Sequence, residues 1–396
     1  MVTGMRDFLP NEKQRREKAL MLIRNVYAKY GFSEIETPVM EDIDTLRGSS
    51  GGDNTKMTFE VLKRRIKPDI LSKAQSPQEL VDLGLRYDLT VPLSRFYGDN
   101  KASLPTVFKS VQIAPVWRAE RPQKGRYRQF MQCDIDIIGE SASIAEIELV
   151  TVIVNALAAL GINDVTIRMN DRKLLDRFLN DNSIPDEQKN QALVILDKRD
   201  KLSEEKIVEE FAKVNISSNV ASQLLNFYSL QEDDELATII ASVNTILGRE
   251  VAVFDPSLVR GMDYYTGTIY EVQSADESYS LGGGGRYDNM IGALSGTPTP
   301  AVGFSLGFER IVDLITSKLD SEEESVALVY SPSTDPQVTV AYMQALNTLT
   351  GQGYRTRLVK KAKNTRLLLD RLQAEGFTAF AFIDENNTEA SLRSFS

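Results

Sequence analysis

The chain has 396 residues, of which 42% are hydrophobic and 26% are charged, and its formal net charge is −10. This length predicts two or three domains of a soluble globular protein, and the acidic balance argues against indiscriminate nucleic-acid binding. The absence of histidine and the single cysteine, Cys133, exclude a Ser-His-Asp triad, an imidazole metal site and a disulfide framework.

The first elements along the chain are a helix, a strand and a loop. The N-terminal residues MVTGMRDFLPNEK contain no apolar segment typical of a signal peptide, which together with the single cysteine predicts a cytoplasmic protein. A helix is predicted from Asn11 to about Tyr30, and FSEIETPVM predicts a strand that ends near Pro38. Residues 48–54 predict a flexible loop, and residues 76–83 predict a short helix.

Residues 116–139, VWRAERPQKGRYRQFMQCDIDIIG, are two strand-like halves around a Pro-Gln-Lys-Gly turn. Five cations lie within eleven residues of this hairpin: Arg118, Arg121, Lys124, Arg126 and Arg128. Strand alternation places one set of side chains on a polar face: Phe130, Gln132, Asp134 and Asp136. The opposite face is predicted to be core: Met131, Cys133, Ile135 and Ile137. The charged face predicts a site for a polar, phosphate-bearing ligand on an antiparallel sheet.

The middle of the chain is predicted to be helical. The apolar stretch 144–162 contains Glu146, Glu148 and Asn155, so it predicts a buried helix and not a membrane span. Ser143 and Glu146 have the spacing of a capping box at the start of this helix. Residues 171–247 contain short amphipathic helices without a strand signal, which predicts an inserted helical domain.

Strands return after residue 249, and a linker is predicted at 317–325. The remaining residues have β-α-β-α-β order, which predicts a small domain with a largely parallel sheet. Residues 355–371 contain seven cations and only one carboxylate, Asp370. This segment is either a nucleic-acid-binding surface or a solvated helix face.

Four segments of the chain resemble the motifs of class II aminoacyl-tRNA synthetases. EIETPVME is similar to the end of motif 1, with Pro38 as its proline, and Arg118-x-Glu120…Arg126-x-x-x-Phe130 is similar to motif 2. GFSLGFER resembles motif 3, and RGMDYYTGTIYE resembles the histidine-recognition signature of one family, the histidyl-tRNA synthetases. The resemblance covers essentially the whole chain.

The resemblance implies an α+β fold, in which an antiparallel class II sheet is flanked by helices and carries a helical insertion and a small C-terminal α/β domain. The implied boundaries are 1–165 for the first part of the catalytic core with motifs 1 and 2, and 166–248 for the insertion. Residues 249–320 would form the second part of the core, with the histidine signature and motif 3. Residues 326–396 would form a short domain resembling an anticodon-binding module. Motif 1 forms the dimer interface in this family, so a homodimer is implied.

The implied activity is the ATP-dependent ligation of histidine to its tRNA through a histidyl-adenylate, with Mg²⁺ bound mainly through ATP. Arg118 and Arg260 would be catalytic, on opposite sides of the reacting α-phosphate. Glu120 would accept from the adenine amino group and Phe130 would stack on adenine. Arg126 and Arg310 would neutralise the outer phosphates.

Recognition of an imidazole requires hydrogen-bond acceptors. The resemblance assigns Asp88, Asp136 and Tyr265 to the side-chain pocket, and Thr90 and Gln132 to the α-amino group. Four further residues complete the implied histidine site: Arg118, Arg260, Tyr264 and Tyr287.

Purely structural roles remain open for the same residues. The hairpin cations could form a ladder of cross-strand salt bridges, and Arg260 could be an ordinary ion-pair partner. Asp88 could cap a turn, Asp136 could face solvent, and one of the paired tyrosines 264 and 265 could be core.

Two other functions compete with tRNA ligation. A regulatory subunit of ATP-phosphoribosyltransferase would share the catalytic fold, bind histidine and not charge tRNA, and the short segment after Val326 favours it. The intact Arg118, Arg126, Arg260 and Arg310, together with the basic residues of 355–371, argue against it. A nucleic-acid-binding module without catalysis does not explain the pocket of acceptors.

Overall fold

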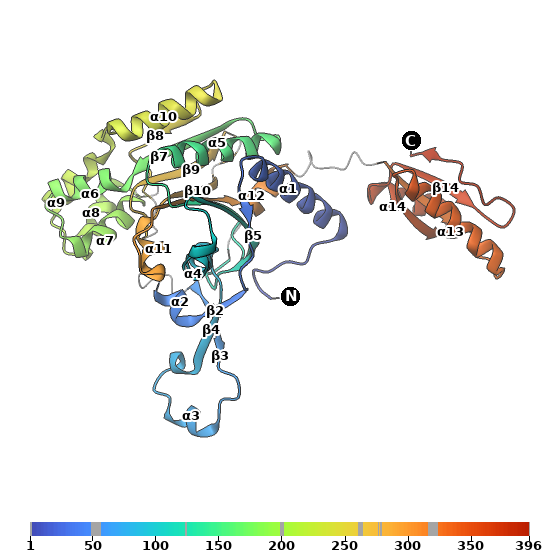
Figure 1. Cartoon of the computed structure of the whole chain (residues 1–396), viewed down its shortest axis with the longest axis horizontal. Helices are drawn as coiled ribbons and strands as arrows, with labels where there is room; N and C mark the ends of the chain where they lie inside the picture. Colours follow the sequence, from blue (N-terminus) through green and yellow to red (C-terminus); the bar gives the residue numbers. More distant parts are fainter. Residues whose placement is uncertain are drawn as a thin grey trace. The chain divides into compact units, whose positions relative to one another are not determined.

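The computed structural model describes residues 2–48, 57–122, 125–198, 202–259, 264–275, 277, 279–315 and 324–395. It divides into two compact units (Figure 1). The first contains Met1–Asp7 and Ala19–Ile315, and the second contains Phe8–Lys18 and Thr316–Ser396. The finer division of the catalytic core at residues 165, 248 and 320 stays a prediction.

An eight-stranded sheet forms the centre of the first unit. Its order is β1 (Ser33–Glu34), β5 (Phe108–Trp117), β6 (Gln129–Ile138), β11 (Ala301–Gly307), β10 (Ser280–Arg286), β9 (Thr268–Ser274), β7 (Val165–Asp171) and β8 (Ala252–Phe254). The two outer pairs, β1–β5 and β7–β8, are parallel, and every pair between them is antiparallel. The predicted antiparallel sheet is therefore confirmed.

The long strands β5 and β6 are the two halves of the predicted hairpin. They pair in register from Phe108 opposite Ile138 to Trp117 opposite Gln129. The apolar face of β6 is buried at Cys133, Ile135 and Ile137, as predicted, whereas Met131 at the open end is only half-buried. Strand alternation thus sends the polar side chains of β6 to the opposite face of the sheet.

Helices flank the sheet. α5 (Ile144–Ala159) and α12 (Phe308–Ile315) pack on β6, and α4 (Thr90–Asn100), which η3 (Lys101–Ser103) follows, packs against α11 (Asp288–Ser295). α1 (Pro10–Lys29) begins one residue before Asn11, and the side chain of Glu12 accepts from the Leu9 amide at 3.1 Å, so the predicted cap is wrong. Among the described helices, none is long and apolar enough to cross a membrane.

The predicted capping box of α5 does not form. Ser143 has helical backbone angles and its side chain makes no cap hydrogen bond. Glu146 is buried and instead binds the guanidinium group of Arg286. A buried charge gains more from a paired guanidinium than from one exposed amide, so the tertiary contact prevails over the local motif.

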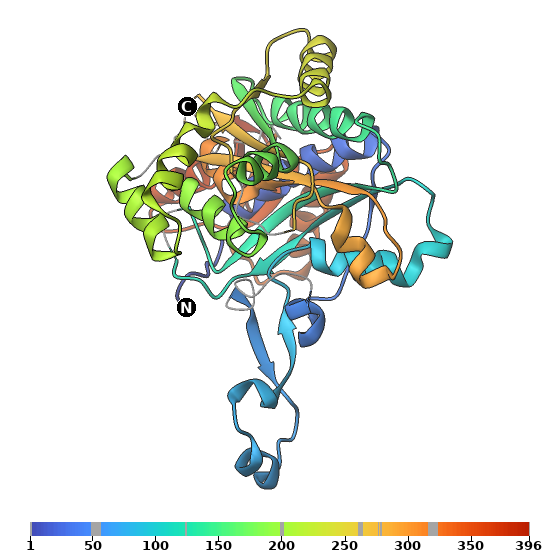
Figure 2. The same ribbon diagram turned by 90° about the vertical axis from the view of Figure 1, so that its left-hand side faces the viewer.

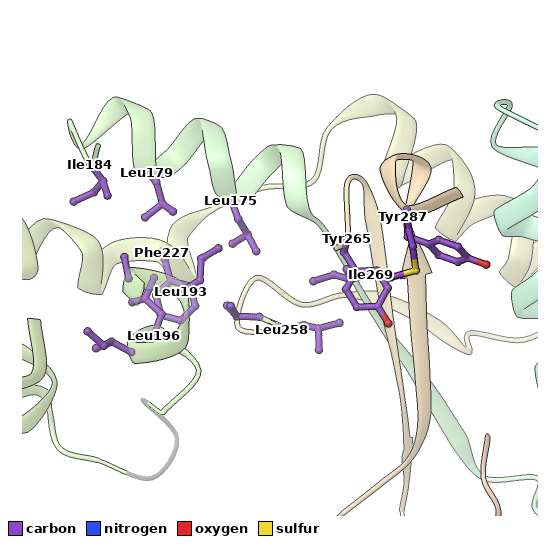
Figure 3. Close-up of a cluster of buried hydrophobic side chains, with 14 of the residues drawn as sticks. Leu175, Leu179, Ile184, Leu193, Leu196, Phe227, Leu258, Tyr265, Ile269 and Tyr287 are labelled. Carbon is purple, nitrogen blue, oxygen red and sulfur yellow. The ribbon is translucent and has the colours of Figure 1, made fainter. Parts of the chain in front are cut away.

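The segment after β7 is helical, as predicted. Its helices are α6 (Arg172–Asp181), α7 (Asp186–Leu196), α8 (Glu204–Lys213), α9 (Ser218–Leu224), η4 (Leu225–Ser229) and α10 (Asp234–Leu247). The apolar faces of α6, α7, α8, α9 and η4 share one hydrophobic cluster with side chains at the sheet (Figure 3), whereas α10 contacts α5 and β8. The cluster runs from Leu193 and Phe227 to Tyr265, Ile269 and Tyr287.

A smaller sheet in the first unit has three strands, in the order β2 (Met40–Asp42), β4 (Val81–Leu85), β3 (Phe59–Leu62). α2 (Ile43–Gly48) follows β2, and α3 (Pro68–Lys73) and η2 (Pro77–Leu80) lie between β3 and β4. The helix predicted over 76–83 is wrong beyond Leu80, because Val81–Leu85 pairs with both β2 and β3. The predicted loop 48–54 lies outside the described residues after Gly48.

The second unit has the predicted β-α-β-α-β order: β12 (Ser325–Tyr330), α13 (Pro336–Gly351), β13 (Arg355–Lys360), α14 (Thr365–Ala374) and β14 (Ala379–Ile383). β12 pairs in parallel with β13 and with β14. A short antiparallel strand, β15 (Arg393–Ser394), adds to β14 and was not predicted. Buried side chains such as Val326, Leu328 and Tyr342 form the core of this unit.

Candidate active site

Every predicted site residue that the structure describes lines one cavity of about 660 Å³ in the first unit. These residues are Asp88, Thr90, Arg118, Glu120, Arg126, Phe130, Gln132, Asp136, Tyr264, Tyr265, Tyr287 and Arg310. The remaining predicted residue, Arg260, lies outside the described residues. The volume is that of a site for a small organic ligand.

The polar face of β6 forms the floor of the cavity. Gln132, Asp134 and Asp136 are all buried there, at successive inward positions of the strand. The Gln132 amide nitrogen donates to Ser305 Oγ at 3.0 Å and to Asp134 Oδ2 at 3.3 Å. Its carbonyl oxygen is buried without a hydrogen-bond partner among the described groups. Such an orphaned acceptor favours a ligand that donates at this point.

The two carboxylate oxygens of Asp88 have different surroundings. Its Oδ1 accepts from the Val91 amide at 3.2 Å in the first turn of α4, so the turn-capping alternative is correct for this oxygen. Its Oδ2 is buried and has no partner among the described groups. Thr90 lines the cavity two residues later. One carboxylate therefore both starts the helix and leaves an acceptor for a ligand.

Asp136 is buried at 3% exposure, so the alternative in which it faces solvent is wrong. Its Oδ1 accepts from the Tyr287 hydroxyl at 2.5 Å. Gly303 on β11 lies opposite Asp136 in the register, and a Cβ atom at 303 would overlap Asp136 Oδ1. The glycine thus supplies the space that the carboxyl group fills.

The buried carboxyl groups have raised pKa values. Burial raises the pKa of Asp136 to about 7, the Tyr287 hydrogen bond opposes the rise, and the charge of Asp88 adds to it. Burial raises the pKa of Asp88 to about 6 and that of Asp134 well above its usual range. Since the chain has no histidine, Asp88 and Asp136 supply titration near neutral pH in this cavity.

Arg118 and Phe130 lie together at the open end of β5 and β6. Arg118 Nε donates to the Tyr87 carbonyl at 3.1 Å, and its guanidinium carbon is 5.1 Å from the centre of the Phe130 ring. Neither Arg118 nor Arg126 has an ion pair with a carboxylate in the described part of the chain. The salt-bridge ladder is therefore wrong for these two residues.

The outer end of the cavity is held by contacts that the sequence did not reveal. Arg310 Nη1 donates to the Ser280 carbonyl at 2.6 Å, and its guanidinium carbon is 5.4 Å from the Tyr279 ring centre. Glu309, its buried neighbour, accepts from Arg6 Nη2 at 2.6 Å and from the Met131 amide at 3.1 Å. Glu309 thereby links the first turn of α12 to β6 through Met131 and to the N-terminal segment through Arg6.

The tyrosines form the wall between the cavity and the hydrophobic cluster. Tyr265 is 9% exposed and belongs to that cluster (Figure 3). Tyr264 is half-buried and packs against the cluster. Their ring centres are 4.7 Å apart, and Tyr264 meets Tyr287 edge-on at 6.1 Å. Tyr264 and Tyr265 also line the cavity, so each side chain contributes both to the hydrophobic packing and to the cavity wall.

A buried ion pair lies at the residue before Tyr287. Arg286 Nε and Nη2 donate to the two oxygens of Glu146 at 2.5 and 2.7 Å, and Thr268 Oγ1 donates to the same carboxylate at 3.3 Å. This fork ties α5 to β10 one residue before Tyr287. The residues are 140 positions apart, and the sequence offered only the misleading capping spacing of Glu146.

The comparisons with known proteins agree along the chain. The family model described as histidyl-tRNA synthetase matches residues 4–311. The histidine–tRNA ligase of Leifsonia xyli is 45% identical over 98% of this chain and 96% of its own, and the probable histidine–tRNA ligase of Tropheryma whipplei (strain Twist) is 39% identical over 96% and 95%.

Solved structures share the fold. Histidyl-tRNA synthetase from Nostoc sp. PCC 7120 has a TM-score of 0.79 at 24% identity, covering 100% of this chain and 94% of its own. The Bacillus halodurans protein titled ATP phosphoribosyltransferase regulatory subunit/histidyl-tRNA synthetase has a TM-score of 0.75 at 20% identity, covering 96% and 97%. With the family match and these relatives, the antiparallel sheet and its hairpin are those of a class II aminoacyl-tRNA synthetase. The chain belongs to the histidyl-tRNA synthetase family.

Replacement of Gly303 tests the crowding at Asp136. Gly303→Ala should lower the free energy of unfolding by about 1–3 kcal/mol, because the new methyl group overlaps Asp136 Oδ1. Gly48→Ala is the matched control, since a Cβ at 48 meets no atom of the described residues within 4 Å. Urea titration measures both, and equal stability of the two variants would contradict the packing described for β11.

The raised carboxyl pKa values predict the pH dependence of stability without ligand. Between the unfolded and folded pKa values the folded state binds more protons, so stability increases as the pH falls. With Asp136 near 7 and Asp88 near 6, we expect a gain of about 1–2 kcal/mol from pH 8 to pH 6. Asp136→Asn should reduce this slope. Asp171, with a pKa of about 6, contributes equally to both proteins. Stability that rises toward pH 8 would disprove the assignment.

Proposed function

We propose that the chain ligates histidine to its tRNA in two ATP-dependent steps through a histidyl-adenylate. The observation that carries this proposal is that hydrogen-bond acceptors suited to histidine and arginines suited to phosphates line the same cavity. Buried acceptors, on Asp88, Gln132 and Asp136, lie at one end, and the cations Arg118 and Arg310 lie along the same cavity. The family membership supports the proposal over the whole chain.

The amino acid would occupy the acceptor end. The ring N–H groups of histidine would bind among Asp88, Asp136 and Tyr265, and the α-ammonium group would bind Thr90 and Gln132. The orphaned oxygens of Asp88 and Gln132 support this placement, because neither has a donor among the described residues. An analogue without the ring N–H would leave such acceptors unpaired, which makes the site selective.

ATP would occupy the arginine end. Phe130 offers a ring face for adenine, and Glu120 an acceptor for its amino group. Arg118 would hold the α-phosphate and the amino-acid carboxylate, and Arg126 and Arg310 would neutralise the outer phosphates. Mg²⁺ would accompany ATP on its β- and γ-phosphates and add positive charge there. We propose Arg260 for the face of the α-phosphate opposite Arg118.

The chemistry then requires positioning and charge neutralisation. The histidine carboxylate attacks the α-phosphorus, the bond to the β-phosphate oxygen breaks, and pyrophosphate leaves. A hydroxyl group of the 3′-terminal ribose of the tRNA next attacks the acyl carbon, and AMP leaves. Fixed guanidinium groups stabilise the charge on the α-phosphate during the first step without a proton transfer, which suits a site that contains no histidine side chain.

The regulatory-subunit alternative has less support. It shares this fold, and the Bacillus halodurans structure carries both descriptions in its title. The curated relatives at 45% and 39% identity are named as histidine–tRNA ligases over nearly the full length of both chains. A site equipped for ATP, with Arg118 and Arg126 free of carboxylate partners in the described residues, has no use in a sensor of histidine alone.

Two further features belong to the proposal. The motif 1 segment leaves Val39 and Met40 exposed, at 40% and 49%, which supports a homodimer through this segment. The second unit, with its basic residues 355–371, would contact the tRNA. A cytoplasmic location fits the single, buried Cys133.

Two assays on the purified protein test the function. We expect histidine-dependent exchange of pyrophosphate into ATP and transfer of histidine to tRNA. Asp136→Asn should lower kcat/KM for histidine by about tenfold or more, since an amide donor replaces part of the acceptor, while KM for ATP should change little. Binding of histidine without either reaction would favour the regulatory subunit.

Arg260 provides the mechanistic test. Arg260→Ala should lower the rate of adenylate formation by at least about a hundredfold while histidine binding weakens less, because the proposed contact forms mainly in the transition state. Single-turnover adenylate formation and equilibrium dialysis measure the two effects. Equal losses in both would mean that Arg260 only holds the substrate.

A further inference from the structure

An arm with a basic tip projects from the first unit. We define the arm as residues 59–85, which comprise β3, α3, η2 and β4, and Figures 1 and 2 show it extending from the helices and sheet of that unit. Its tip, residues 63–73, carries a cluster of cations against one carboxylate, Asp69. The cations are Lys63, Arg64, Arg65, Lys67 and Lys73. On a chain of net charge −10, this is a local reversal of sign.

The rest of the arm carries three carboxylates, Glu60, Glu79 and Asp82, but none of them forms an ion pair with a cation of the tip in the described residues. The five cationic side chains of the tip are exposed, and none has an ion pair with a carboxylate in the described residues. Lys63 Nζ donates only to the Glu79 carbonyl, at 2.8 Å. Glu60, lower in the arm, is already paired with Arg47 at 2.6 Å. A polyanion would therefore meet the tip without displacing an existing partner.

Apolar side chains accompany these cations. Leu62, Ile70 and Leu71 are 58%, 44% and 60% exposed. Arg65 has a left-handed backbone with φ of 57°, which turns the chain before Pro68 begins α3. Cations that bind phosphates, next to aliphatic groups that pack on sugars, are suited to a nucleic-acid backbone.

The base of the arm is joined to the cavity. β4 continues directly into Arg86, whose carbonyl accepts from the Trp117 amide at 3.0 Å, and Asp88 follows two residues later. The Ala119 amide donates to the Met57 carbonyl at 2.7 Å, which fixes the start of the arm beside Arg118. The arm therefore leaves the molecule at the rim of the cavity that the 3′ end of a tRNA must enter.

We propose that the tip of the arm binds the phosphate backbone of the tRNA whose 3′ end enters the cavity. This inference rests on the proposed function and adds a second contact, independent of nucleotide sequence, near the reacting end. The contact contributes to the affinity for tRNA and leaves adenylate formation unaffected, because histidine and ATP do not reach the tip.

The test removes three charges at the tip from the full-length protein. The variant is Arg64→Gln, Arg65→Asn and Lys67→Gln, with asparagine at 65 because it tolerates the left-handed backbone. The matched control removes three exposed cations elsewhere in the first unit, through Lys29→Gln, Lys101→Gln and Lys206→Gln. Pyrophosphate exchange, aminoacylation at several salt concentrations and sedimentation are measured for both.

We expect exchange to stay within about twofold of the starting protein in both variants. KM for tRNA should rise about tenfold or more in the arm variant and less than about twofold in the control. The affinity for tRNA should also depend less steeply on salt: the negative slope of log affinity against log salt should become shallower by about 2 units in the arm variant alone. An unchanged KM for tRNA, or loss of exchange, would overturn the proposal. A shift from dimer to monomer would overturn it in favour of a second copy of the chain as the occupant. Absence of exchange in the starting protein would instead refute the proposed function.

Discussion

The burial of three carboxyl groups in one cavity is the constraint on which the rest of the site depends. Asp88, Asp134 and Asp136 are each less than 5% exposed, and their charges repel one another. Protein groups satisfy part of this set, through the Val91 amide at Asp88, Ser305 and the Gln132 amide at Asp134, and the Tyr287 hydroxyl at Asp136. Asp88 Oδ2, which has no partner among the described groups, can be satisfied by a cationic, donor-rich ligand. The unliganded fold thus carries an electrostatic cost that ligand binding offsets.

The surrounding elements keep this costly arrangement in place. β6 pairs along its length with β5 and β11, which fixes the direction of its polar side chains. The Arg286–Glu146 pair holds α5 against β10, and the hydrophobic cluster holds the tyrosines from the other side. The site is built on strands with buried neighbours, so its acceptors are preorganised.

Sequence reasoning predicted the sheet, the helical segment and the β-α-β-α-β unit because these follow from periodicity and chain order. It also placed Gln132 and Asp136 on one face, because alternation along a strand is a local property. The failures were non-local. Strand pairing of Val81–Leu85 replaced the end of a helix predicted over 76–83. Glu146 was predicted to cap α5 and instead pairs with Arg286, 140 residues away. The contacts of Glu309 and Gly303 depend on strand neighbours that no local pattern specifies.

Positions 136 and 303 share one volume. Gly303 faces Asp136 across β11 and β6, and the Tyr287 ring closes the same space, since a Cβ atom at 303 would lie 3.1 Å from its Cε1 atom. A larger residue at 303 fits only after the residue at 136 becomes smaller or moves, so the two positions must change together. Either single change alone is unfavourable. A change of substrate to another amino acid through these positions would therefore require substitutions at both 136 and 303. Single substitutions, made one at a time, do not readily reshape this part of the pocket.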